Sequence, residues 1–214
     1  MTYTRVNISI GGRSLRLAYR MFSIPARSID IVKNETQPAF AIWLTGLPAS
    51  GKSSVTSALA GQLRIRGIEF TVLESDRMRT MFSESPQYDE RERELFYTSL
   101  AFIGQVLIEH RISVIFDATA NLRSYRNRAR QQIARFIEVL VDTPLEVCAG
   151  RDPKGIYKMA REGKASHVPG VQSPYEPPEN PDVVIHGDKE DPQTAASRIV
   201  SCLQAKGFLS RSQS

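Results

Sequence analysis

The sequence predicts an α/β protein in which a parallel β-sheet is flanked by helices and preceded by an N-terminal β-hairpin. From residue 40 onward, short apolar runs typical of buried strands alternate with segments that repeat apolar residues at helical spacing. Before residue 38, two segments alternate apolar and polar residues instead, which is the pattern of half-buried strands. We therefore expect an N-terminal extension over residues 1–37 and a main domain over residues 38–214.

The extension carries the predicted hairpin. Residues 6–10 and 14–19 both alternate with period two, and Gly11 and Gly12 lie between them. A Gly-Gly pair readily adopts the positive φ angles of a two-residue hairpin turn. Because an isolated hairpin is only marginally stable in water, we expect this one to pack on the main domain or on a partner subunit.

The main domain is expected to hold five strands, with helices between most of them and one at the end. A first helix should cover residues 54–66, where Gly67 ends it, and a long helix near 90–110 contains Gly104. Residues 163–182 hold five prolines and lack apolar periodicity, so we expect a long loop that acts as a lid or binding segment. The predicted strands lie at residues 40–45, 69–74, 112–117, 135–141 and 182–186.

Residues 46–53 read G-L-P-A-S-G-K-S, which fits the phosphate-binding pattern G-x-x-x-x-G-K-[ST]. The loop lies between a strand and a helix, so main-chain N–H groups and the positive end of a helix dipole would converge on one anion. Lys52 would reach the outer phosphates, and Ser53 would offer its hydroxyl to Mg²⁺. The motif predicts a P-loop NTPase-type sheet that binds ATP and Mg²⁺. The expected nucleotide-binding residues of the loop are Gly46, Leu47, Pro48, Ala49, Ser50, Gly51, Lys52, Ser53 and Ser54.

Two carboxylates follow neighbouring strands at the sheet edge where ligands of parallel sheets bind. Asp76 comes after the second main-domain strand, and Asp117 ends the third. Phosphoryl transfer needs a carboxylate that accepts a hydroxyl proton and carboxylates that hold Mg²⁺. We interpret Asp76 as a catalytic residue beside Lys52 and as part of the metal site with Ser53 and Asp117. For each aspartate, a helix cap is the alternative reading.

Basic side chains fall near the same strand ends. Arg79, Arg93 and Arg123 could converge on a phosphorylated acceptor and hold it by bidentate hydrogen bonds. A basic helical segment at residues 151–161 follows the fourth strand, where Arg151 and Lys154 could close over the nucleotide. Taken singly, each of these residues could instead be an ordinary surface cation.

The bulk composition narrows the class of protein. With 214 residues and 41% hydrophobic content, the chain can bury one sizeable core. No apolar stretch approaches the roughly 20 residues that cross a bilayer, so we expect a soluble, cytoplasmic protein with no membrane partner. The net charge is +5, but residues 1–37 hold six Lys and Arg against two Asp and Glu, which leaves a nearly neutral main domain. Nucleic acid is therefore not an expected partner. Cys148 and Cys202 lack metal-binding spacing and receive no role.

A run after the fourth strand makes the chain recognisable. Residues 141–163 read V-D-T-P-L-E-V-C-A-G-R-D-P-K-G-I-Y-K-M-A-R-E-G, and residues 173–177 read S-P-Y-E-P. Together with W-L-T-G-L at residues 43–47, they resemble the adenylylsulfate (APS) kinase family of P-loop kinases. The resemblance covers roughly residue 41 to the C-terminal helix. It implies that MgATP phosphorylates the ribose 3′-hydroxyl of adenosine 5′-phosphosulfate to give PAPS, and we also expect a homodimer.

The resemblance also implies roles for single residues. Asp76 matches the acceptor-activating aspartate, and Arg79 matches an arginine that contacts the substrate. Tyr88 stands where the family has a phenylalanine that stacks on the acceptor's adenine. Arg93 matches the arginine of the family's D-R-x-x-N motif. The complete set of expected acceptor-binding residues is Arg79, Tyr88, Arg93, Asn121, Arg123 and Lys154.

Several departures from the family fall on the acceptor half of the site. The substrate-binding asparagine is Phe96, the paired arginines are Thr98 and Ser99, and the lid motif F-T-G reads V-P-G from Val168. The lid change removes the second half of the adenine sandwich. An Asp-Ala-Thr at residues 117–119 resembles more distant P-loop kinases that act on sugars and polynucleotide ends.

Three alternatives therefore stay open. The first is an APS-kinase-like enzyme that phosphorylates another nucleotide-linked or phosphorylated metabolite, for example in polysaccharide or natural-product synthesis. The second is a regulatory nucleotide-binding module, and the third is a nucleic-acid 5′-kinase, which the nearly neutral main domain disfavours.

Overall fold

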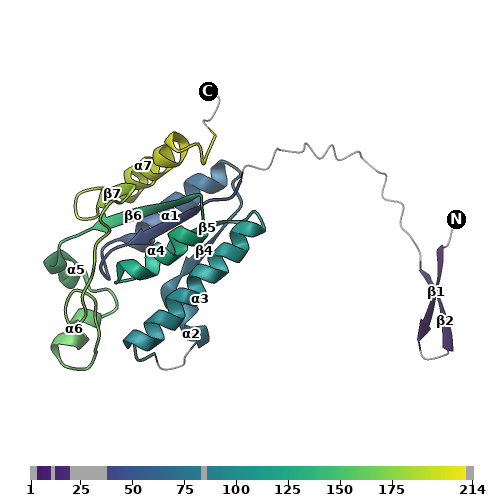
Figure 1. The fold of residues 1–214 in the computed structure, drawn as a ribbon, viewed down its shortest axis with the longest axis horizontal. Helices are drawn as coiled ribbons and strands as arrows, with labels where there is room; N and C mark the ends of the chain where they lie inside the picture. Colours follow the sequence, from purple (N-terminus) through teal and green to yellow (C-terminus); the bar gives the residue numbers. More distant parts are fainter. Residues whose placement is uncertain (1–3, 11–12, 20–37, 83–85, 211–214) are drawn as a thin grey trace. The chain divides into compact units, whose positions relative to one another are not determined.

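The computed structural model describes residues 4–10, 13–19, 38–82 and 86–210, which divide into two units, Met1–Glu35 and Thr36–Ser214. In the first unit, β1 (Thr4–Ile10) and β2 (Arg13–Tyr19) form an antiparallel pair in which Ile10 lies opposite Arg13 (Figure 1). This confirms the predicted hairpin, whose turn and linker lie outside the described residues. Its packing on the main domain or on a partner subunit and the domain boundary at residue 38 stay predictions.

The second unit contains a parallel five-stranded sheet in the order β4-β5-β3-β6-β7, so that the strand leading into the phosphate loop is central. All five predicted strands are present, each within one residue of its expected bounds. They are β3 (Ala41–Thr45), β4 (Phe70–Glu74), β5 (Ser113–Asp117), β6 (Phe136–Asp142) and β7 (Val183–His186).

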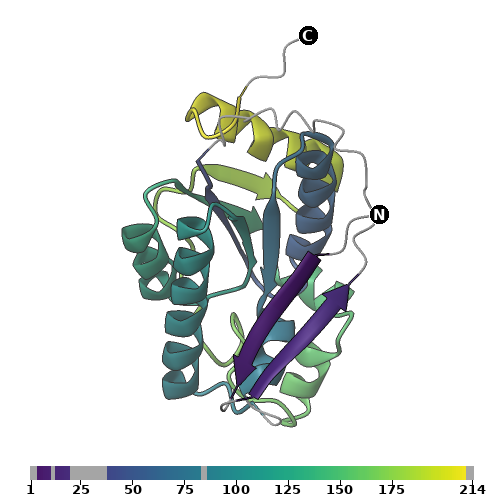
Figure 2. The same cartoon turned by 90° about the vertical axis from the view of Figure 1, so that its right-hand side faces the viewer.

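Helices cover both faces of the sheet, as its fully buried central strand requires. Ile42 and Leu44 of β3 pack in one hydrophobic cluster with residues of α1 and α7. Ala41 and Trp43 face the opposite cluster, which includes residues of α3 and α4. In both views the sheet lies between these two helix pairs (Figures 1 and 2). Their bounds are α1 (Lys52–Ile65), α3 (Glu90–Glu109), α4 (Arg123–Gln132) and α7 (Pro192–Ala205).

The basic segment at residues 151–161 is not one continuous helix as expected. Helix α5 (Leu145–Arg151) ends where the expected segment begins, and α6 (Ile156–Arg161) starts after a turn. Asp152 and Gly155 adopt positive φ angles of 24° and 68°, and the Asp152 carboxylate accepts hydrogen bonds from the N–H groups of Tyr157 and Lys158 in the first turn of α6. The turn places Lys154 at its tip rather than on a helix face.

A short helix, α2 (Ser75–Phe82), also follows β4 directly. It puts Asp76 in its first turn. Among the described residues, no helix is both long enough and apolar enough to cross a membrane.

Gly104 lies within α3 because the ring of Phe116 occupies the space where a Cβ would be. We expect Gly104→Ala to lower the free energy of unfolding by about 1–3 kcal/mol, since overpacking outweighs the better helix propensity of alanine. The matched control is Gly61→Ala in α1, where a Cβ would meet nothing within 4 Å. This control should raise stability by about 0.5–1 kcal/mol. Urea unfolding measures both changes, and equal stabilisation by the two would show that Phe116 can move aside.

Candidate active site

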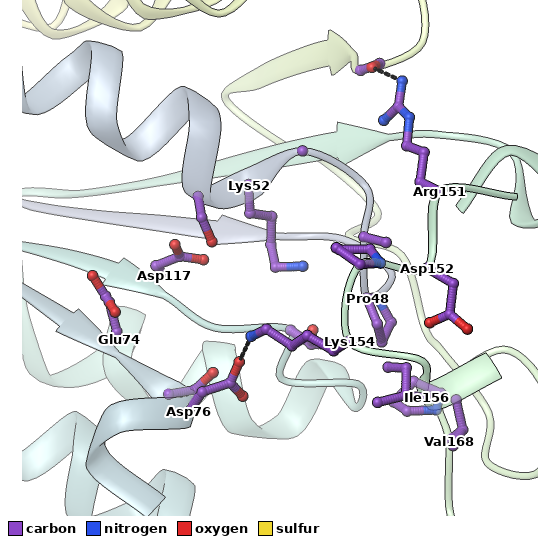
Figure 3. A pocket seen from close by; sticks show the side chains of 18 of the residues that line it. Pro48, Lys52, Glu74, Asp76, Asp117, Arg151, Asp152, Lys154, Ile156 and Val168 are labelled. Carbon is purple, nitrogen blue, oxygen red and sulfur yellow. Dashed lines mark hydrogen bonds and ion pairs between the residues drawn. The ribbon is translucent and has the colours of Figure 1, made fainter. Parts of the chain in front are cut away.

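The carboxyl ends of the strands open onto a cavity of about 1250 Å³. Its wall is formed by the phosphate loop, the ends of β4 and β5, the turn between α5 and α6, residues 164–169 and residues 187–192 (Figure 3). Pockets for single drug-sized ligands typically measure about 300–1,000 Å³. The cavity therefore has room for two substrates side by side.

Most sequence-predicted site residues meet in this cavity. Gly46, Leu47 and Ser50 belong to the phosphate loop but are not among the lining residues, and neither are Asn121 and Arg123. The predicted residues that do line it are Pro48, Ala49, Gly51, Lys52, Ser53, Ser54, Asp76, Arg79, Tyr88, Arg93, Asp117, Arg151 and Lys154.

The loop packs closely against the neighbouring strand ends. A Cβ on Gly46 would overlap the main-chain oxygen of Val141, and one on Gly187 would overlap the carbonyl oxygen of Ser50. Arg151 fastens the same region, because its guanidinium donates to the carbonyls of Gly187 at 2.8 Å and Ser50 at 3.4 Å. These contacts fasten the loop to the ends of the neighbouring strands.

Lys52 lies along the inside of the loop. Its side chain is buried, and Nζ donates to the carbonyls of Gly46 at 3.1 Å and Leu47 at 2.8 Å. Burial lowers the pKa of Lys52, while the carboxylates of Asp117 and Asp76 act in the opposite direction. The ammonium group is therefore enclosed near two carboxylates at the start of α1, where helix N–H groups lack intrahelical partners.

The same place offers hard oxygen donors. Asp117 ends β5 and is 6% exposed, and Ser53 is the second residue of α1. No cluster of three or more His, Cys, Asp or Glu side chains that could hold a metal alone occurs in residues 38–82 and 86–210. A hydroxyl and one or two carboxylates, completed by phosphate oxygens, suit Mg²⁺. The residues fit a magnesium ion that binds together with a nucleotide.

Asp76 is paired with Lys154 across the cavity (Figure 3). The hydrogen bond to Asp76 is the main cause that raises the pKa of Lys154. A lysine whose pKa is raised by folding stabilises the folded state fully at pH values below the pKa of the unfolded chain. This stabilisation is lost only as the pH rises through the raised pKa of the folded state, so the pair of Lys154 and Asp76 stays intact at neutral pH. Both side chains are about two-thirds exposed, at 66% for Asp76 and 65% for Lys154.

We expect Lys154→Ala to leave the melting temperature almost unchanged, because exposed ion pairs contribute about 0–1 kcal/mol. If Lys154 binds the acceptor as predicted from the sequence, the substitution should lower kcat/KM for the acceptor about tenfold or more, the loss expected for one charge-assisted hydrogen bond. Lys158→Ala on α6, which removes an exposed cation that does not line the cavity, is the control. Steady-state kinetics and thermal melts give both numbers. Equal activity of the two variants would contradict a role for Lys154.

Arg93 joins three separate segments. Its Nε donates to the carbonyl of Tyr88 at 2.7 Å, Nη1 to Oδ1 of Asn121 at 2.8 Å and Nη2 to the carbonyl of His167 at 2.6 Å. Asn121 is 3% exposed and donates through Nδ2 to the carbonyl of Pro174. Direct contact between Asn121 and the acceptor stays a prediction; in the structure its side chain bonds Arg93 and Pro174 and does not line the cavity.

Arg123 is bonded away from the cavity. Its Nε donates to the carbonyl of Pro177 at 2.9 Å, its Nη1 pairs with Glu179, and its main-chain N–H donates to Glu176. These bonds fasten the loop after residue 173 to the start of α4. Contact between Arg123 and the acceptor stays a prediction that this geometry does not favour.

A family model for adenylylsulphate kinase matches residues 38–186. The chain belongs to the adenylylsulphate kinase family. This confirms the membership expected from the run at residues 141–163.

Individual relatives agree with this assignment. The adenylyl-sulfate kinase of Synechococcus sp. strain JA-3-3Ab is 36% identical over 168 residues, which cover 78% of this chain and 96% of that protein. The adenylyl-sulfate kinase of Gloeothece citriformis is 36% identical over 173 residues, 81% of this chain and 98% of that protein. The solved APS kinase of Mycobacterium tuberculosis, in complex with AMPPNP and APS, superposes with a TM-score of 0.73 at 33% identity and covers 78% of this chain and 98% of that one.

In this member of the adenylylsulphate kinase family, Phe96 stands where the family has an asparagine, and its ring packs against Arg79. The Arg79 guanidinium carbon lies 3.9 Å from the centre of the Phe96 ring and 4.9 Å from that of Tyr88. Glu92 accepts a hydrogen bond from Arg79 at 3.3 Å. Arg79 is 4% exposed, so stacking and the ion pair hold it in one orientation at the cavity wall.

Some residues that line the cavity were not predicted from the sequence. Glu74 ends β4, and residues 188–192 follow β7, so the strand-end rule could have found both. Tyr97, Thr119 and His167 also line the cavity. Tyr97 lies at no strand end, and the sequence carries no signal for it, whereas His167 falls in the segment at residues 163–182 that the sequence predicts to be a lid or binding loop.

Proposed function

We propose that this protein transfers the γ-phosphoryl group of ATP to the ribose 3′-hydroxyl of APS, giving ADP and PAPS. The observation that carries the proposal is that Lys52 and the phosphate loop share one cavity with Asp76, Arg79 and Tyr88. Family membership supports the reaction class. The solved relative from Mycobacterium tuberculosis binds an ATP analogue and APS.

Donor binding falls to the phosphate loop. Its main-chain N–H groups and the start of α1 would hold the β- and γ-phosphates of ATP, with Lys52 neutralising charge that develops during transfer. Ser53 and Asp117 would hold Mg²⁺, which supplies further neutralisation of the phosphates when bound. Arg151, fixed between Ser50 and Gly187, would lie beside the nucleotide.

Asp76 would activate the acceptor by accepting the proton of its 3′-hydroxyl. Lys154 bonds its Oδ2, which leaves Oδ1 to accept the proton of the 3′-hydroxyl. As the ribose 3′-oxygen forms a bond to the γ-phosphorus, the bond between the γ-phosphorus and the β,γ-bridging oxygen breaks and ADP leaves. Arg79 and Lys154 would pair with the anionic groups of the acceptor.

An ADP-release assay with MgATP tests the proposal. The acceptors are APS, a CDP-linked compound, a sugar and no acceptor. We expect ADP formation to depend on APS. Turnover with another acceptor, while APS stays at the background ATPase rate, would assign the enzyme to a different metabolite, and ATP binding without any acceptor-dependent turnover would indicate a regulatory module.

We also infer a homodimer and a cytoplasmic location from the sequence. Light scattering of the purified protein tests the first. A single species with the mass of one 24.0 kDa chain would contradict it.

A further inference from the structure

Three described residues that line the cavity carry aromatic rings: Tyr88, Tyr97 and His167. Tyr97 cannot offer a ring face, because it is 2% exposed and stacks on Tyr125 with ring centres 4.7 Å apart. Its hydroxyl also accepts a hydrogen bond from the Ala120 N–H at 3.0 Å. Tyr88, at 38% exposure, and the exposed His167 therefore remain as rings that a ligand can reach.

These two residues share an unusual backbone conformation. Tyr88 has a φ of 58° and His167 a φ of 62°. Left-handed backbone is uncommon outside glycine, and such conformations cluster at ligand-binding sites where the surrounding structure holds them in place. The two residues come from segments far apart in the sequence.

One guanidinium holds both of them. Arg93, which is 6% exposed, donates from Nε to the Tyr88 carbonyl and from Nη2 to the His167 carbonyl. Nε and Nη2 form one edge of the rigid guanidinium fork, so the two carbonyls lie side by side. Asn121 fixes the third nitrogen, Nη1. Arg93 thereby sets the spacing between the segment before α3 and the segment at residues 164–169.

Val168, which directly follows His167, carries no aromatic ring. Val168 is 6% exposed and packs in a small cluster with Cys148, Tyr157 and Ala160. Arg79 lies over the Tyr88 ring at 4.9 Å, which places a cation beside the same ring. His167 is thus the ring-bearing residue of residues 164–169 at this end of the cavity.

We infer that His167 contacts the substrate, its imidazole and the Tyr88 ring forming a slot for the planar base of the acceptor, with Arg93 as the positioning residue that holds the two in register. The inference rests on the proposed function, in which the acceptor carries an adenine. Stacking on a side-chain ring tolerates many bases, so His167 determines affinity for a nucleotide acceptor over a sugar.

The test compares His167→Asn with His167→Phe in the full-length enzyme. Asparagine tolerates left-handed backbone and lacks an aromatic ring, whereas phenylalanine restores one. We expect His167→Asn to raise the KM for APS about 5- to 150-fold with little change in kcat or in the KM for ATP. His167→Phe should return the KM for APS close to the wild-type value. His110→Asn, at the exposed end of α3, is the matched control and should change none of these constants.

The outcomes separate the inference from the proposed function. If wild-type enzyme uses APS and His167→Asn leaves its KM unchanged, the slot is disproved and the function stands. If both His167 variants lower kcat and raise the KM for ATP and APS alike, His167 has only a structural role. If wild-type enzyme does not phosphorylate APS, the proposed function fails, and the slot for its base fails with it.

Discussion

Replacing Asp76 by asparagine is expected to lower kcat by about 10²- to 10⁴-fold, the usual contribution of a positioned general base. Asparagine keeps the size of the side chain and can still accept a hydrogen bond from Lys154, so the cavity should keep its shape. It cannot take up the proton of the acceptor hydroxyl. Because the phosphate loop is untouched, the affinity for ATP should change little. Single-turnover phosphorylation and titration with a fluorescent ATP analogue measure the two quantities separately.

Glu69→Gln provides the control for Asp76→Asn. Glu69 is an exposed carboxylate that directly precedes β4, whereas Asp76 follows that strand. The control removes the same charge from the far end of the same strand and should keep full activity. If Asp76→Asn retains more than about a tenth of wild-type kcat, Asp76 is not the general base.

Lys52→Ala should lower kcat/KM for ATP by about 10²- to 10³-fold, the loss typical of one group that stabilises transition-state charge. The buried ammonium of Lys52 neutralises phosphate charge where water is largely excluded, and alanine offers no replacement. The carbonyls of Gly46 and Leu47 also lose their bonds to Nζ, so the loop should become less ordered. Calorimetric ATP titration and steady-state kinetics check both effects.

Arg64→Ala is the control for Lys52→Ala, since it removes one positive charge from the last turn of the same helix, away from the cavity. It should bind ATP normally. Circular dichroism and a thermal melt establish that Lys52→Ala is folded. Wild-type affinity and turnover in a folded Lys52→Ala protein would contradict phosphate binding by the loop.

The sheet and the donor half of the site could be predicted because their determinants are local in sequence. The phosphate loop is one contiguous motif between a buried strand and a helix, and β3 is buried throughout. The two-residue hairpin also follows from local patterning around Gly11 and Gly12. Placing Asp76 and Asp117 at one sheet edge needed only the rule that parallel strands end together.

The break after Arg151 was not predicted because the basic residues on either side of it were interpreted as one helix, although Pro153 and Gly155 are local turn signals. Pro153 lacks an N–H, and the Asp152 carboxylate caps a new helix, so the backbone turns there. Side-chain spacing alone does not reveal such a turn. The turn sets where Lys154 meets Asp76.

The acceptor half could not be predicted because its contacts join distant residues. Arg93 bonds Asn121, 28 positions away, and His167, 74 positions away. No local pattern links these residues. The resemblance supplied Arg93 as a substrate contact, which stays a prediction; in the structure Arg93 lines the cavity and also bonds the segments at Tyr88, Asn121 and His167.

The most direct test of the account is to identify the product of wild-type enzyme incubated with MgATP and APS. Mass spectrometry and ³¹P NMR should find ADP and a phosphate ester at the ribose 3′ position of APS in equal amounts. Inorganic phosphate in place of that ester, with APS recovered unchanged, would contradict the proposed reaction.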